Sequence, residues 1–128
     1  MYHRNPPLFA MMESTREGEE MYQGTTPALV LRVKDKDLTE ATVFASIRTG
    51  TNVVTKTGED LTVTTDDEDT LIVCTLTQNE TLKLNTGDAL VQVRYITSDG
   101  NAYATTKAKL NVNDVIYKNV IEYAEDEA

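Results

Sequence analysis

Short segments of alternating apolar and polar residues follow one another along this chain, and each ends in residues that favour turns. Residues 28–33 read ALVLRV, residues 41–48 read ATVFASIR, and residues 88–97 read DALVQVRYIT. Alternation with a period of two places the apolar side chains on one face of a β-strand. We expect five such strands before residue 77, with no helical segment long enough to join parallel strands. The pattern predicts an antiparallel sandwich or a small barrel.

The second half of the chain carries the clearest turn signals. Residues 77–80, Thr-Gln-Asn-Glu, match a capping box, in which the Thr hydroxyl and the Glu carboxylate each satisfy a backbone N–H at a helix start. Gly87 follows too soon for more than one helical turn, so we expect this turn to connect strands on opposite sheets. Residues 98–101, Ser-Asp-Gly-Asn, predict a type I′ hairpin between strands at residues 88–97 and 102–112.

The charge balance opposes the common electrostatic partners. The 128 residues include 21 acidic and 12 basic side chains, for a formal net charge of −9 at pH 7. Phosphate backbones and anionic lipids repel such a chain, and no apolar run approaches the length of a membrane span. We therefore expect neither nucleic-acid binding nor membrane binding. The length fits one domain with its own core.

Residues that carry common catalytic chemistry are scarce. His3 is the only histidine and Cys74 the only cysteine, so the usual residues of a serine triad or a zinc site are missing. The six glycines lack the spacing of a phosphate-binding loop. Carboxylates are numerous but cluster in loops, where turn formation and solubility explain them. We predict no catalytic residue, no cofactor and no metal.

Two features leave alternatives open. Residues 66–69, Asp-Asp-Glu-Asp, lack the ligand pattern of an EF-hand. We expect a solvated hairpin loop there, with calcium binding as the alternative. Cys74 lies in an apolar run without a neighbouring cation, which predicts a buried structural thiol rather than a reactive one.

The first 21 residues differ in composition from the rest. They contain two of the three prolines and the only histidine, and they show no strand or helix period. Their apolar patch, residues 8–12, is too short for a signal peptide. Residues 18–20, Gly-Glu-Glu, can be encoded by a purine-rich sequence that resembles a bacterial ribosome-binding site, so translation from Met21 is one hypothesis and a flexible arm is the other. We expect a leader over residues 1–21 and the sandwich over residues 22–114.

The remaining segment, residues 115–128, combines an apolar stretch with an acidic end and reads VIYKNVIEYAEDEA. Its apolar spacing suits a short helix and an extended arm equally well. An exposed apolar segment at the end of a small domain is a candidate for docking on a partner, and the alternative is that it covers the base of its own sandwich. The candidate docking residues are Val115, Ile116, Tyr117, Val120 and Ile121.

Several segments resemble one family when they are taken together. They are QGTTPALVLRV at residues 23–33, LTQNETL at residues 76–82, VQVRYITSDG at residues 91–100 and VIYKNVI at residues 115–121. This combination is similar to small structural proteins of Firmicutes bacteriophages and prophages, and the similarity spans residues 22–121. Those proteins are tail or baseplate associated, in the style of the N-terminal domain of the baseplate upper protein. The resemblance implies an immunoglobulin-like antiparallel β-sandwich of about seven strands with one short helical turn.

The resemblance also implies a function without catalysis. A protein of this family is a virion component that is made in the bacterial cytoplasm and binds other virion proteins and copies of itself. A capsid decoration protein is the nearest alternative, and an immunoglobulin-like adhesion module of a bacterial surface is the next. A small enzyme that uses carboxylates alone is the third.

Overall fold

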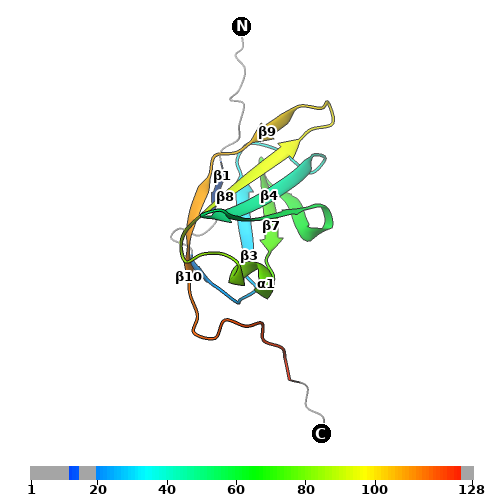
Figure 1. Cartoon of the computed structure of the whole chain (residues 1–128). Coiled ribbons are helices and arrows are strands. Elements are labelled where there is room, and N and C mark those ends of the chain that lie inside the picture. Colours follow the sequence, from blue (N-terminus) through cyan, green and yellow to red (C-terminus); the bar gives the residue numbers. More distant parts are fainter. Residues whose placement is uncertain (1–11, 15–19, 125–128) are drawn as a thin grey trace.

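The computed structural model describes residues 12–14 and 20–124, which fold into two facing β-sheets (Figure 1). Sheet A consists, in spatial order, of β1 (Met12–Ser14), β3 (Ala28–Val33), β7 (Asp69–Thr75) and β6 (Leu61–Asp66). Sheet B consists of β2 (Glu20–Tyr22), β10 (Ala108–Asn113), β8 (Gly87–Ile96), β4 (Thr42–Thr49) and β5 (Asn52–Thr57), with β9 (Ala102–Ala104) paired to one end of β8. A 3-10 turn, Gly58–Asp60, joins β5 to β6, and the helix α1 (Gln78–Leu82) joins β7 to β8.

The strand order is that of an immunoglobulin sandwich. The series β1-β3-β7-β6 takes the places of strands A, B, E and D, and the series β10-β8-β4-β5 those of G, F, C and C′. Among the described residues, β2 and β10 form the parallel pair, and the other strand pairs are antiparallel. The predicted all-β sandwich with one short helical turn is confirmed.

Alternation along the long strands fills the core between the sheets. In β8, Val91, Val93 and Tyr95 are buried, as their spacing predicts, while Arg94 points to solvent. Leu31 and Ile72, which are partners across β3 and β7, are also buried. Each sheet thus buries its apolar face against the other sheet and exposes its opposite face to solvent.

The described part of the chain contains ten strands rather than about seven, for two physical reasons. The strands β1 and β2 have three residues each, too few to show a period of two in the sequence. The single strand expected at residues 102–112 is split at Thr105, whose N–H donates to the Val93 carbonyl at 2.9 Å while its Oγ1 accepts from the Val93 N–H at 3.1 Å. One extra residue is accommodated here between β9 and β10, as in a β-bulge.

The sandwich begins before the expected boundary at residue 22. The strand β1 pairs with β3, and Met21 in β2 is buried in the core. A chain that starts at Met21 lacks β1, which is an edge strand of sheet A. His3 and residues 18–19 lie outside the described residues.

The predicted capping box opens α1. The N–H of Glu80 donates to the Thr77 hydroxyl at 3.1 Å, and the N–H of Thr77 donates to Glu80 Oε1 at 2.8 Å. Glu80 also forms an ion pair with Lys56 of β5 at 2.9 Å. Burial raises the pKa of the Glu80 carboxyl, but the Thr77 N–H and Lys56 outweigh it and hold the pKa below its usual value. The ion pair therefore anchors α1, which follows β7 of sheet A, to β5 of sheet B.

Candidate functional site

The chain leaves β10 as an arm without helix or strand, formed by residues 114–124 (Figure 1). We call these residues the C-terminal arm. Of the two conformations that the sequence allows for this segment, the structure shows the extended one. The arm passes the end of the sandwich at which α1 lies, and Figure 1 shows it continuing away from the two sheets.

Two contacts hold the first part of the arm on the sandwich. Val115 is half-buried beside Gly24. Lys118 Nζ donates to Gln23 Oε1 at 3.0 Å, and the Gln23 amide in turn donates to the Leu84 carbonyl at 2.7 Å. Gln23 is buried, so it links the arm to the connection between α1 and β8.

A third contact holds the distal part of the arm by its backbone. The N–H of Ile121 donates to Gln78 Oε1 at 2.8 Å, and Gln78 Nε2 donates to the Ile121 carbonyl at 2.9 Å. The side-chain amide of Gln78 thus pairs with both backbone groups of one residue, much as a residue of a neighbouring antiparallel strand does. Because the pairing involves only backbone atoms of Ile121, it leaves the isoleucine side chain free to contact something else.

The apolar side chains of the arm face solvent. Ile116 is 101% exposed, Tyr117 is 63% exposed and Tyr123 is 89% exposed, and Val120 and Ile121 are exposed as well. Of the five candidate docking residues, only Val115 is packed against its own sandwich, as the alternative of a covering arm expects. Soluble proteins seldom expose a contiguous apolar segment unless it is used. The arrangement is suited to binding an apolar partner surface.

Sequence reasoning missed two residues of this site. Tyr123 directly follows the apolar stretch but is not among the five candidate docking residues. The sequence shows Gln78 only as part of the capping box, and its partner Ile121 is 43 positions away. The aromatic side chain of Tyr123, two positions after Ile121, is a usable signal for an apolar contact. The pairing of Gln78 with the arm has no local signal.

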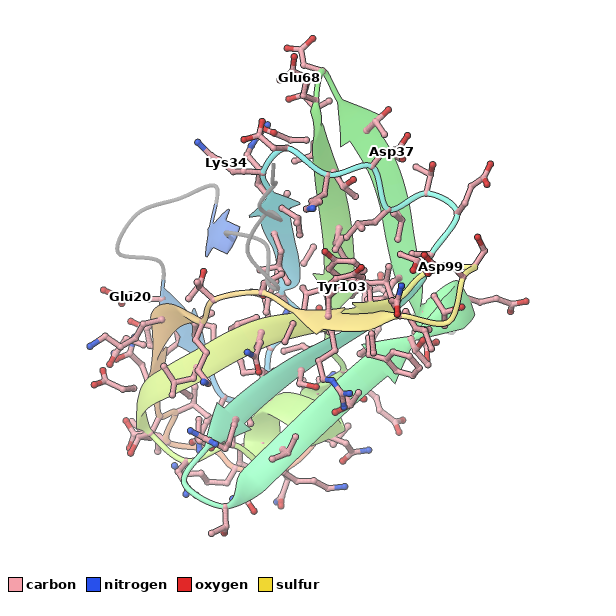
Figure 2. All side chains as sticks on the ribbon, turned by 90° about the horizontal axis from the view of Figure 1, so that it is seen from above. Glu20, Lys34, Asp37, Glu68, Asp99 and Tyr103 are labelled. Carbon is pink, nitrogen blue, oxygen red and sulfur yellow. The ribbon has the colours of Figure 1, made fainter. Side chains whose placement is uncertain are left out.

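The acidic loop of residues 66–69 forms a hairpin tip that is held by a cation from sheet A. Arg32 pairs with Asp66 and with Asp69, each at 2.8 Å. The backbone N–H of Asp35 and then Arg32 hold the pKa of Asp69 below its usual value. Glu68 projects from the tip (Figure 2). Within residues 12–14 and 20–124, no group of three His, Cys, Asp or Glu residues is placed to hold a metal ion.

Cys74 is a buried core residue, as predicted. Its side chain in β7 is 3% exposed, and burial raises the pKa of the thiol to about 11. The neutral thiol is therefore the stable form across the physiological range.

Across residues 12–14 and 20–124, no helix has the length and apolar character that a membrane span requires. No family model matches the sequence, and no curated protein is significantly similar to it.

Proposed function

We propose that this protein is a non-enzymatic structural module of a bacteriophage or prophage virion, and that it makes protein–protein contacts through its C-terminal arm. The observation that carries the proposal is the arm itself, in which polar contacts are made by backbone and Lys118 while the apolar side chains point outward. The tail or baseplate location comes from the resemblance of residues 22–121 to such proteins.

The energetics of the arm favour use as a contact. Burying one large apolar side chain stabilises a contact by about 1.5–3 kcal/mol. The arm offers such side chains at Ile116, Tyr117 and Tyr123. Its attachment to Gln23 and Gln78 restricts it before it binds, and this lowers the entropy cost of docking.

Composition of virus particles tests the proposed function. Particles are purified from a strain that carries the gene, after prophage induction, and their proteins are quantified by mass spectrometry. We expect the protein to be present at a fixed ratio to known tail proteins, with tail or capsid genes on both sides of its own gene. Absence from particles while the protein is abundant in the cells, or metabolic genes on both sides, contradicts the proposal.

Variants then connect the arm with incorporation. The double variant Ile116→Ser, Ile121→Ser keeps the backbone pairing with Gln78 but removes two exposed apolar groups. We expect it to be depleted from particles. The control is Val30→Ser, which replaces a half-buried apolar residue of β3 that is not part of the arm. Equal incorporation of the arm variant and the control contradicts a role of the arm.

A further inference from the structure

We propose that the C-terminal arm of one copy binds the outer face of sheet B of a second copy, so that copies join head to tail. By the outer face of sheet B we mean the solvent side of β4, β5 and β8 together with Lys107. The contact rests on the proposed function, since it names the partner of the arm that the proposed function uses.

The outer face of sheet B contains two adjoining hollows. One, of 420 Å³, has Phe44 and Ile96 in its lining, with Arg94 beside them. The other, of 150 Å³, includes Val53 and Leu90 in its lining. Ser46 lines both, so they form one continuous strip across the strands.

The apolar groups of this strip come from neighbouring strands. Phe44 of β4 lies opposite Arg94 of β8, and Ile96 follows Arg94 on the same face of β8. Phe44 is 37% exposed, Ile96 is 39% exposed and Val53 is 55% exposed. An extended segment with side chains such as those of Ile121 and Tyr123 can bury its apolar groups here.

Charge favours the arm as the occupant. The protein has a net charge of −9, yet the strip includes Arg48, Arg94 and Lys107. None of these three cations has an ion-pair partner within residues 12–14 and 20–124. The distal arm carries the opposite charge next to its apolar side chains, with Glu122 followed in the sequence by acidic residues 125–127. Complementary charge of this kind sets orientation and partner choice.

The attachment of the arm favours a second copy over the arm's own domain. Gln78 holds Ile121 at α1, at the end of the sandwich, and the arm then leads away from the sheets (Figure 1). The arm and the strip are different surfaces, so the contact is heterologous and builds rings or open chains. Repeated assembly of this sort suits a component present in many copies.

Complementation between two full-length variants tests the contact. The face variant carries Arg48→Glu and Arg94→Glu, and the arm variant carries Ile121→Ser, Glu122→Lys and Tyr123→Ser. The matched control for the face variant is Lys36→Glu with Lys83→Glu. It makes the same change in net charge as the face variant, at residues that line neither hollow. Sedimentation velocity over a range of concentrations measures association, and circular dichroism checks that each variant is folded.

We expect the wild-type chain to associate, and both variants to weaken association by about tenfold or more. The control is expected to behave as wild type, and about 1 M NaCl to weaken the contact. The decisive sample is an equal mixture of the two variants, which is expected to form a one-to-one dimer, since one supplies an intact arm and the other an intact face. A wild-type chain that stays monomeric, a control that weakens association equally, or a mixture without dimers overturns the proposal.

The particle experiment separates this contact from the proposed function. If the protein is found in particles but the purified chain is monomeric, the head-to-tail contact is wrong and the arm binds another virion protein. If the mixture forms dimers but the protein is absent from particles, the contact stands and the virion role is wrong.

Discussion

The pairing of Gln78 with Ile121 predicts that one side chain controls the order of the distal arm. The substitution Gln78→Ala removes the acceptor of the Ile121 N–H, at 2.8 Å, and the donor to the Ile121 carbonyl, at 2.9 Å. It leaves the Thr77 and Glu80 capping contacts in place, and alanine is the best helix former at the first position of α1. The change therefore releases the arm without weakening the helix.

The expected size follows from the two hydrogen bonds. Each contributes a net stabilisation of about 0.5–1.5 kcal/mol, and the low part of this range applies because both are exposed. Loss of about 1–2 kcal/mol corresponds to a factor of about 5–30 in the equilibrium between the attached and released arm. The free energy of unfolding of the whole domain should change by less than about 0.5 kcal/mol, as for other surface substitutions.

Amide hydrogen exchange followed by NMR measures this equilibrium at one residue. We expect the protection of the Ile121 N–H to fall by about 5- to 30-fold in Gln78→Ala. The control is Asn101→Ala, which removes another side-chain amide, one that donates to Asp99 in the turn between β8 and β9 and lines neither hollow. An Ile121 amide that exchanges at the unprotected rate in the wild-type chain, or equally in all three proteins, refutes the reasoning.

Three further predictions concern stability and reactivity. Thr81→Val leaves the Gly24 N–H and the Thr25 carbonyl without the buried hydroxyl that meets both at 2.9 Å, so urea denaturation should show a loss of about 2 kcal/mol. Cys74, with a thiol pKa of about 11, should resist iodoacetamide at neutral pH in the folded chain and react once urea unfolds it. Because the pKa of Asp69 is lower in the folded chain, its stabilising effect is present above the unfolded pKa of about 4 and lost as the pH falls through the folded pKa. The difference in melting temperature between the wild type and Asp69→Asn should therefore shrink as the pH falls from about 4 through the folded pKa of Asp69.

The fold could be predicted where local chemistry decides it. Alternation in residues 28–33 and 88–97 gave strands with the correct buried faces, and residues 77–80 gave the capped turn. The short strands β1 and β2 could not be predicted, because their hydrogen bonds come from strands distant in sequence and their three residues carry no period.

The candidate site was predictable only in part for the same reason. The apolar residues of the arm stand out in the sequence, but their spacing does not decide between a helix and an extended chain. That Gln78 holds the arm, or that Arg94 lies opposite Phe44 on the strip, depends on strand register and on contacts between distant residues. Alternation assigns each side chain to a face, but it does not say which side chains from other strands lie next to it.

The attachment of the arm also sets a limit on how far Gln78 can affect assembly. If the attached arm is the form that binds, the apparent affinity falls in proportion to the fraction of chains with the arm attached. Gln78→Ala can then weaken head-to-tail association by no more than the factor by which it lowers the equilibrium constant for arm attachment, which the exchange of the Ile121 amide measures. Ile121→Ser should separate the two measurements. Its backbone pairing with Gln78 remains, so the protection of the amide at residue 121 is unchanged, but the apolar contact is lost and association weakens. If Gln78→Ala weakens association by more than it lowers the equilibrium constant for arm attachment, Gln78 does more than position the arm. It then contacts the second copy directly.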